Sequence, residues 1–379
     1  MIYFDAAATT LEKPEQVSRA VASAVNSMSS PGRGIHSAAR MAEETAFRCR
    51  MEAAELFGVR KPENVVFTGN ATHALNIAIR SLVRPGCRVI LSGYEHNAVT
   101  RTLASIPDVE LTIVNTPLFR PDAAAEGFEQ AMAHGNAVAI CNHVSNVFGY
   151  ILPVSQIARS CRNHDVPLIV DASQSAGVLP VRLDELGAAF IAMPGHKGLY
   201  GPQGTGLLLC GNEQAEPVLF GGTGSASRQQ HMPADLPDRL EAGTHNMPGI
   251  AGLLEGLRFV RKTGIQKISA YEKMLTKAAV HELRRLPGVH VFAAEEPNAQ
   301  AGVLSFTADG WDCEELGTAL ARRGIAVRAG LHCAPLAHRT AGTLPQGTVR
   351  ISFSAFNSSR QVGRFAAVLR QILREKVTL

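Results

Sequence analysis

Residues 167–177 of the chain read PLIVDASQSAG, a short apolar run that ends in an acid and a turn. A near-continuous run of Leu, Ile and Val is typical of a strand that is buried on both faces of a parallel sheet. Open α/β sheets bind their ligands at the carboxyl ends of such strands, where Asp171 stands. Asp171 is therefore a candidate site residue, although an acid after a strand is also a common N-cap of the next helix.

The segments around this strand alternate between helical and strand patterns, as in a doubly wound α/β core. Apolar runs before residue 210 predict strands at 64–68, 88–92, 137–144, 167–172, 188–193 and 204–210. Helical patterns lie between them at 40–58, 72–83 and 154–164. After residue 245 a long helical stretch over 250–286 precedes strands at 288–293, 301–306, 325–330 and 348–354, with helices at 313–324 and at the end of the chain. We expect a large α/β domain over residues 15–245 and a smaller α+β domain over residues 1–14 and 246–379.

Composition narrows the class of protein. The 379 residues exceed the roughly 250–300 at which a single core stops growing. The net charge of +4 comes from scattered charges, which predicts no nucleic-acid partner. No apolar stretch approaches the roughly 18 residues that span a bilayer, and an acid stands where a signal peptide carries bases, so we expect no membrane association and a cytoplasmic location. Seven cysteines without a C-x-x-C pair fit reduced thiols.

A glycine-rich turn at residues 194–206, PGHKGLYGPQGTG, carries Lys197. The glycine spacing matches neither a dinucleotide-binding fingerprint nor a P-loop. The plainer interpretation is a tight connection between two strands whose lysine faces water. However, a buried-strand acid followed by a lysine in such a turn is what pyridoxal phosphate requires. Lys197 would form a Schiff base, and Asp171 would pair with the pyridinium nitrogen.

Two further stretches could hold the other parts of that cofactor. Residues 67–76, FTGNATHALN, predict a strand, a turn and a helix N-terminus, which together bind anions, with Thr72 adding a hydroxyl. His96 follows another strand, where it could stack on the ring and move protons. Taken alone, each is as readily an ordinary helix cap or a loop residue.

Cys333 lies in residues 326–338, AVRAGLHCAPLAH, after Arg328 and next to His332. Cationic neighbours favour the thiolate, which is the nucleophilic form of cysteine. The spacing of His332, Cys333 and His338 matches no zinc pattern, so we expect no metal. Arg350, on the next predicted strand, could grip a carboxylate with two nitrogens. Together these residues suggest an amino-acid substrate with sulfur in its side chain, whereas a partly buried thiol and a surface arginine are the plainer alternatives.

These residues lie in ordered motifs along the chain. They include IYFDAAATT, RGIHSAA, ATHALN, YEHNAV, HVSNVFG, VDASQSAG, GHKGLYGPQGTG, RLEAGTHN, RAGLHCAP and VRISFSAFN. Over essentially its full length the chain resembles the class V aminotransferase-like cysteine desulfurases and selenocysteine lyases, in the branch with a short loop around the active cysteine. The resemblance implies the fold type I of pyridoxal-phosphate enzymes, with a mostly parallel seven-stranded sheet and a smaller α+β C-terminal domain.

The resemblance also implies roles for single residues. Catalysis would rest on Lys197, Cys333 and His96. The cofactor would be held by Lys197, Asp171, Gln174, His96, Thr72, Ala71, His196 and, from the neighbouring subunit, Thr244. The substrate would be bound by Asn146, Arg350, Arg328 and His36. His36 would face the subunit interface. Pro194 and Ala71 stand where relatives carry hydroxyl residues, which could weaken cofactor binding by roughly 1 kcal/mol for each lost hydrogen bond.

The implied reaction converts L-cysteine to L-alanine in a homodimer, with the sulfur left on Cys333 as a persulfide. Because the loop after Cys333 is short, a sulfur-acceptor protein or small molecule would have to come to it. Selenocysteine lyase, cystine or cysteine β-lyase and aminotransferase activities are alternatives on the same scaffold. A nucleotide-binding oxidoreductase and a noncatalytic α/β binding module are alternatives of a different class.

Overall fold

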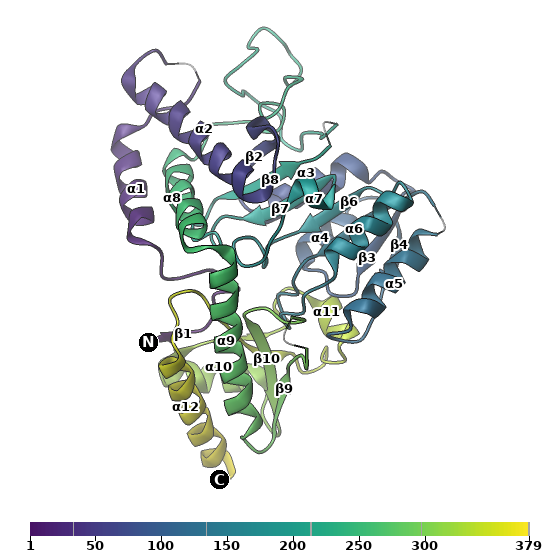
Figure 1. Cartoon of the computed structure of the whole chain (residues 1–379), viewed down its shortest axis with the longest axis vertical. Helices are drawn as coiled ribbons and strands as arrows, with labels where there is room; N and C mark the ends of the chain where they lie inside the picture. The colour runs from purple at the N-terminus through teal and green to yellow at the C-terminus, as the bar shows by residue number, and fades with distance from the viewer. Residues whose placement is uncertain (33, 134, 213, 297, 378–379) are drawn as a thin grey trace.

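The computed structural model describes residues 1–379 except 33, 134, 213, 297 and 378–379. Its larger sheet has seven strands in the order β2-β8-β7-β6-β5-β3-β4 (Figure 1). All neighbours are parallel except β8, which is antiparallel to both β2 and β7. The strands are β2 (Val65–Thr68), β3 (Arg88–Ser92), β4 (Glu110–Val114), β5 (Ala137–Asn142), β6 (Leu168–Asp171), β7 (Phe190–Pro194) and β8 (Gly206–Cys210). The mostly parallel seven-stranded sheet is thus confirmed, with β4 added at an edge where the sequence analysis expected no strand.

Helices cover both faces of this sheet, as a doubly wound core requires. Side chains of α2, α5, α6, α7 and α8 pack on one face, and those of α3 and α4 pack on the other. Helix α1 lies against α8. The bounds are α1 (Glu15–Ser27), α2 (Ser37–Phe57), the 3₁₀ turn Pro62–Asn64, α3 (Ala71–Leu82), α4 (Asn97–Ala104), α5 (Pro121–Met132), α6 (Val154–Asn163), α7 (Leu183–Leu186) and α8 (Met247–Thr263).

A second core forms around the four-stranded antiparallel sheet β12-β13-β10-β9. The N-terminal strand β1 (Ile2–Tyr3) pairs in parallel with β11 (Ile325–Ala326), so the start of the chain joins its C-terminal part. The remaining elements are β9 (Val289–Phe292), β10 (Val303–Ala308), β12 (Arg328–Gly330), β13 (Thr348–Ser352), α9 (Ile265–Arg284), α10 (Cys313–Arg322), α11 (Pro335–Thr340) and α12 (Ser359–Val377). The exact domain ranges remain a prediction.

The structure divides two of the elements expected in this part. The helical stretch over 250–286 is two helices, because Gly264 adopts φ +90°, a conformation that ends α8 and that residues with a Cβ rarely adopt. Helix α8 packs on α1 and α2, whereas α9 packs on α12. The predicted strand over 325–330 is divided at Val327 into β11 and β12, which belong to different sheets.

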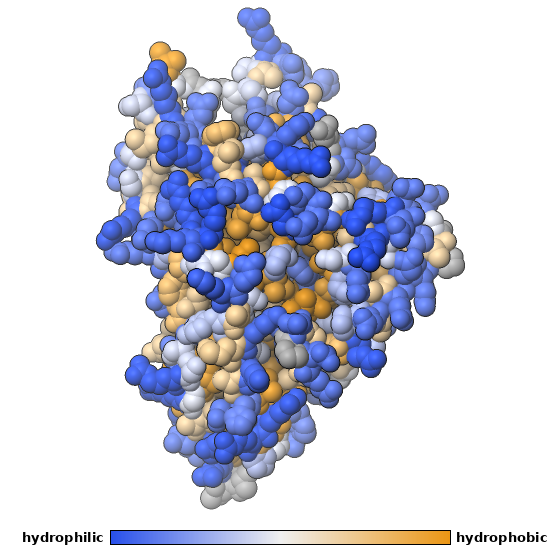
Figure 2. Space-filling model, viewed as in Figure 1, coloured by the Kyte–Doolittle hydropathy of each residue, from blue (hydrophilic) through white to orange (hydrophobic). Residues whose placement is uncertain are grey.

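Figure 2 shows hydrophilic residues over most of the periphery of one face and hydrophobic residues toward its middle. No helix among the described residues is long and apolar enough to cross a membrane.

Candidate active site

One cavity, of ≈ 220 Å³, opens at the carboxyl ends of the parallel strands, where loops of both cores meet. Strands β5, β6 and β7 each end in a residue that lines it, and the small core contributes β12, β13 and the loop between them. The structure brings eleven of the predicted residues together here: Ala71, Thr72, His96, Asn146, Asp171, Gln174, His196, Lys197, Arg328, Cys333 and Arg350. Thr244 and His36 lie elsewhere.

Asp171 is the last residue of β6 and is 4% exposed. One carboxylate oxygen, Oδ1, accepts a hydrogen bond of 2.9 Å from the backbone N–H of Ser173. This contact closes an Asx turn and is not the helix N-cap that the sequence analysis left open, because the next helix, α7, begins only at Leu183. The carboxylate also lines the cavity, so Asp171 combines a local structural role with a place in the site.

Lys197 lies on the turn after β7, and its amine faces the same cavity as Asp171. Burial lowers the pKa of Lys197 to about 8, although the negative charge of Asp171 opposes that shift. Part of the amine is therefore neutral near pH 8. Glycines let this turn pack closely, because a Cβ on Gly198 would lie 2.4 Å from the carbonyl oxygen of Ala176. The plainer interpretation, a lysine that faces water, is wrong.

His96 begins helix α4 as its N-cap, with Nδ1 accepting from the N–H of Ala98 at 3.0 Å. Burial lowers the pKa of His96, and the charge of Lys197 lowers it further, while Asp171 acts in the opposite direction. A neutral ring that accepts at Nδ1 carries its proton on Nε2. His96 is thus both a cap and a lining residue of the cavity.

The predicted anion site lies at the start of α3, where Ala71 and Thr72 are the first two residues. The N-cap is Asn70, whose Oδ1 accepts from the N–H of His73 at 2.9 Å, so Thr72 is not the cap. Across the cavity, burial lowers the pKa of His196 to about 4, with Lys197 and Lys13 adding to the effect. Nδ1 of His196 is buried and has no hydrogen-bond partner among the described residues.

Gln174 also lines the cavity, and its side-chain amide holds the N-terminal segment. Nε2 of Gln174 donates to the carbonyl oxygen of Ala7 at 3.0 Å. Ala7 and Ala8 line the cavity with it. The start of the chain therefore forms part of the site wall, which periodicity in the sequence did not indicate.

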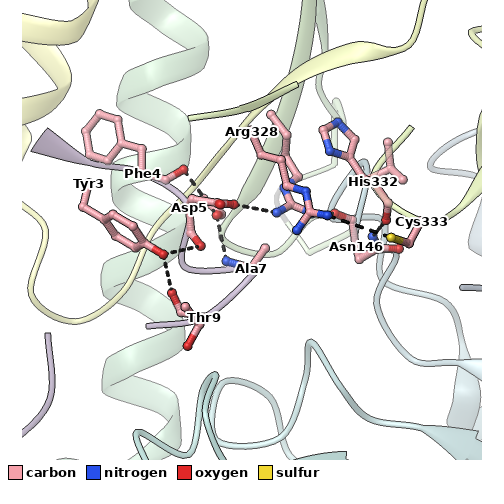
Figure 3. A network of polar contacts seen from close by, with 12 residues as sticks. Tyr3, Phe4, Asp5, Ala7, Thr9, Asn146, Arg328, His332 and Cys333 are labelled. Atoms are coloured by element: carbon pink, nitrogen blue, oxygen red, sulfur yellow. Dashed lines mark hydrogen bonds and ion pairs between the residues drawn. The ribbon is translucent and has the colours of Figure 1, made fainter. Parts of the chain in front are cut away.

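The loop that carries Cys333 has an uncommon backbone. His332 and Cys333 adopt φ of 50° and 56°, a region that costs non-glycine residues about 1–2 kcal/mol each. Hydrogen bonds fix both peptide groups: the carbonyl of His332 accepts from Nδ2 of Asn146 at 2.7 Å, and that of Cys333 accepts from the N–H of Asn97 at 2.8 Å. Figure 3 shows Asn146 beside this loop. The backbone that carries the thiol is thereby held in place.

Arg328 is the cation that the structure places beside the thiol. Its Nη2 lies 3.9 Å from Sγ of Cys333, which is the exposed cysteine among the described ones (Figure 3). The expectation that His332 adds positive charge is wrong, because burial, with help from Arg350, lowers its pKa to about 2. Nε2 of His332 instead donates inward to the carbonyl oxygen of Thr348 at 3.1 Å.

Arg350 is the third residue of β13 and is 1% exposed, which excludes a surface role. Nη1 donates to the carbonyl oxygen of Asn146 at 2.9 Å, and Nη2 donates to Oδ1 of Asp5 at 2.7 Å. Nε has no partner in the part of the chain that the structure describes. Two of the guanidinium nitrogens therefore already donate to protein oxygens, which the sequence alone does not reveal.

Two acidic groups near the site were not predicted. Glu95 is fully buried, and burial raises its pKa to about 8. Its Oε1 accepts from Ser92 Oγ at 2.6 Å and from the N–H of Asn142 at 2.8 Å, which ties the loop before His96 to β5. The acid directly before His96 was the available signal. The second group, Asp5, is the acid in the first ten residues, and only the fold brings it to Arg350.

Thr244 is exposed and lines a separate cavity with Glu241 and His245. His36 is exposed too and is the N-cap of α2, with Nδ1 accepting from the N–H of Ala39 at 3.4 Å. Neither reaches the main cavity of its own chain, so their expected roles between subunits remain predictions. No group of three or more His, Cys, Asp or Glu residues among those described could hold a metal ion.

The chain is similar to known proteins over nearly its whole length. The family model for class-V aminotransferases matches residues 2–365. A probable cysteine desulfurase of Mycolicibacterium paratuberculosis is 32% identical over 98% of this chain, which spans 55% of that relative. One of Pyrococcus abyssi is 30% identical over 99% of this chain and 94% of its own. The chain spans less than two thirds of the first two curated relatives that it matches.

Solved structures agree with the fold. The cysteine desulfurase from Thermococcus onnurineus superposes with a TM-score of 0.89 at 29% identity, covering 99% of this chain and 95% of that one. The cysteine desulfurase CsdA (S-sulfonic acid) from Escherichia coli has a TM-score of 0.85 at 25% identity, covering 98% and 94%. With the family match and a strand order that places Lys197 and Asp171 in one cavity, the chain belongs to the class-V aminotransferase family.

Proposed function

We propose that this protein is a pyridoxal-phosphate-dependent cysteine desulfurase that converts L-cysteine to L-alanine and leaves the sulfur on Cys333. The observation that carries the proposal is that an exposed thiol, a half-buried lysine and a buried strand-end acid line one cavity. The names of the relatives and of the similar structures support it.

The cavity fits the cofactor on its chemistry. Asp171 offers an acid for a protonated ring nitrogen, and Lys197 offers an amine of lowered pKa for the aldehyde. The buried, unpartnered Nδ1 of His196 and the α3 N-terminus with Thr72 offer contacts for the phosphate, while His96 and Gln174 are left for the ring. When bound, pyridoxal phosphate acts as an electron sink that makes the hydrogen on the substrate Cα acidic.

The residues of this chain would carry out the remaining steps, which are substrate binding, proton transfer and sulfur transfer. Arg350, with Asn146 and Arg328, binds the substrate carboxylate. Lys197, part of it neutral near pH 8, takes the proton from Cα and returns one to the product. Sγ of Cys333, next to Arg328, attacks the substrate sulfur. The new Sγ–S bond forms as the Cβ–S bond breaks, the electron pair stays on Cβ, and a proton there completes alanine.

Subunit contacts belong to the same proposal. Large apolar side chains are exposed near His36 and ahead of Thr244: Ile35 is 91% exposed and Phe220 is 77% exposed. Apolar side chains exposed to this extent would leave water if a second subunit covered them, which is favourable. We infer a homodimer in which Thr244 reaches the phosphate of the neighbouring subunit, and a cytoplasmic location consistent with seven free thiols.

The sulfur on Cys333 needs an acceptor. Helix α11 starts at Pro335, two residues after the cysteine, so the thiol has little freedom to move away from the cavity. Its exposure leaves it open from outside. An acceptor thiol, on a protein or a small molecule, would therefore come to the loop.

The test is incubation with L-cysteine and a reductant, with alanine and sulfide measured together. We expect equal yields of both from the parent protein and neither from Cys333→Ala. Cys87→Ala, which changes a half-buried cysteine elsewhere, is the matched control and should behave as the parent does. Full sulfide release by Cys333→Ala, with pyruvate in place of alanine, would favour a β-lyase on this scaffold, whereas a keto acid formed without sulfide would favour an aminotransferase. If the purified protein shows no visible absorbance that borohydride removes, a nucleotide-binding oxidoreductase or a binding module is favoured. A higher rate with selenocysteine than with cysteine would favour a selenocysteine lyase.

A further inference from the structure

Asp5 stands two residues after the end of β1 and forms an ion pair with a buried arginine. Its Oδ1 accepts from Nη2 of Arg350 at 2.7 Å, with the two side chains 19% and 1% exposed. The backbone around Asp5 is fixed as well, because its carbonyl accepts from the hydroxyl of Tyr3 at 3.2 Å (Figure 3). The residue also forms a β-bridge to Ser352 of β13. The N-terminal segment, which the two cores share, therefore holds the carboxylate of Asp5 against the guanidinium of Arg350.

The other nitrogens of Arg350 show what remains for a ligand. Nη1 is used by the carbonyl oxygen of Asn146, and the buried Nε has no partner among the described residues. Arg350 lines the main cavity. A carboxylate that enters the cavity would thus share one guanidinium with the carboxylate of Asp5.

The contact of Asp5 with Arg350 has two opposite effects on the binding of a second carboxylate. A fixed acceptor on Nη2 sets the plane of the guanidinium before any ligand arrives, which favours binding through preorganisation. The negative charge of that acceptor repels a second carboxylate at close range, which disfavours binding. An uncharged acceptor of the same shape would keep the first effect and remove the second.

We propose that Asp5 is a positioning residue that orients Arg350 and, as an internal competing carboxylate, weakens its hold on the carboxylate of the bound amino acid. This rests on the proposed function only in taking that ligand to be an amino acid. Weak binding of the product carboxylate lets L-alanine leave the cavity between turnovers.

The experiment compares L-alanine with L-alaninamide, which lacks the carboxylate charge, by titration calorimetry on the protein as purified with its cofactor. Asp5→Asn keeps an oxygen acceptor without the charge. Asp5→Ser is a second uncharged variant. Glu12→Gln removes one exposed charge from the same segment and is the matched control.

We expect Asp5→Asn to bind L-alanine at least roughly fivefold more tightly than the parent, with the affinity for L-alaninamide and the behaviour of Glu12→Gln unchanged. Equal or weaker binding of L-alanine by a folded Asp5→Asn would overturn the proposal. Binding by Asp5→Ser as tight as that by Asp5→Asn would overturn the positioning role, because Ser lacks the reach of the Asn acceptor, and failure of both variants to fold would overturn the proposal as well. If the parent protein does not convert L-cysteine to L-alanine, the proposed function fails. This comparison remains valid in that case, because the titration needs no turnover.

Discussion

Nζ of Lys13 donates to the carbonyl oxygen of His196 at 3.1 Å, directly before Lys197 in the chain. The same carbonyl accepts from the N–H of Thr10 at 3.1 Å and lies within hydrogen-bond distance of the Thr9 and Thr10 hydroxyls, at 3.2 and 3.1 Å. The N-terminal segment therefore fixes the backbone of the turn that presents Lys197.

Replacement of this lysine tests that role. Lys13→Met should lower the free energy of unfolding by about 1–2 kcal/mol, because it removes hydrogen bonds to Thr10 and to the His196 carbonyl from a half-buried site. The measurement is urea denaturation of the cofactor-free protein, followed by the rate at which added pyridoxal phosphate becomes attached to Lys197. Lys277→Met, at an exposed position of α9, is the control and should change neither quantity. An unaltered attachment rate in Lys13→Met would show that the turn holds its shape without the ammonium group.

The amine of Lys197 should react over an unusual pH range. Burial lowers its pKa to about 8, so the neutral, nucleophilic form should appear through pH 8 in the cofactor-free protein, whereas an ordinary lysine requires a pH above 10. Asp171 raises this pKa, so Asp171→Asn should move the midpoint of labelling to a lower pH. Mass spectrometry of Lys197 after short pulses of an amine-reactive reagent gives the midpoint. A midpoint near 10 in the parent would contradict the buried position.

A buried ion pair holds the segment that leads to Thr244. Glu241 accepts from Arg50 at 2.8 and 2.6 Å and from the N–H of Phe67 at 2.6 Å, and His245 Nε2 lies 2.6 Å away. Glu241→Gln should cost about 3–5 kcal/mol of stability, since it leaves the Arg50 charge buried without its partner. The exposed pair Arg19 and Glu15 offers a control, because Glu15→Gln should change stability by about 0–1 kcal/mol. A loss below about 1 kcal/mol in Glu241→Gln, measured by urea denaturation, would mean that the pair is dispensable.

The same pair predicts a dependence on pH. Burial raises the pKa of Glu241, but Arg50 and His245 outweigh it, so the pKa is lower in the folded protein than in the unfolded chain. A carboxyl with a lowered folded pKa stabilises the protein above its unfolded pKa, and that stability is lost as the pH falls through the folded pKa. The parent should therefore lose stability below about pH 4 more steeply than Glu241→Gln. Parallel curves of unfolding free energy against pH for the two proteins would exclude the linkage.

The sequence predicted those parts of the fold and site that depend on local patterns. The apolar runs identified six strands of the large sheet, and the strand-end position of Asp171 and the glycine turn of Lys197 followed from the same patterns. Strand β4 was missed because its polar residues Glu110 and Thr112 alternate with apolar ones, so no continuous apolar run marks it. Contacts between distant segments, such as Asp5 with Arg350, have no local pattern. The neutral state of His332 depends on burial that appears only after folding.

The left-handed backbone at Cys333 leads to a prediction about stability. At φ 56° a residue with a Cβ is strained, whereas glycine is not. Cys333→Gly should therefore be more stable than Cys333→Ala by about 0.5–1 kcal/mol, the strain relieved being partly offset by the greater freedom of glycine in the unfolded chain. At the exposed helical residue Arg48 the order should reverse, with Arg48→Gly less stable than Arg48→Ala by about 1 kcal/mol. Urea denaturation of the four variants measures both differences. If alanine were the more stable residue at both positions, the loop would relax out of the left-handed region once the thiol is removed, and the hydrogen bonds from Asn146 and Asn97 would not be what holds it there.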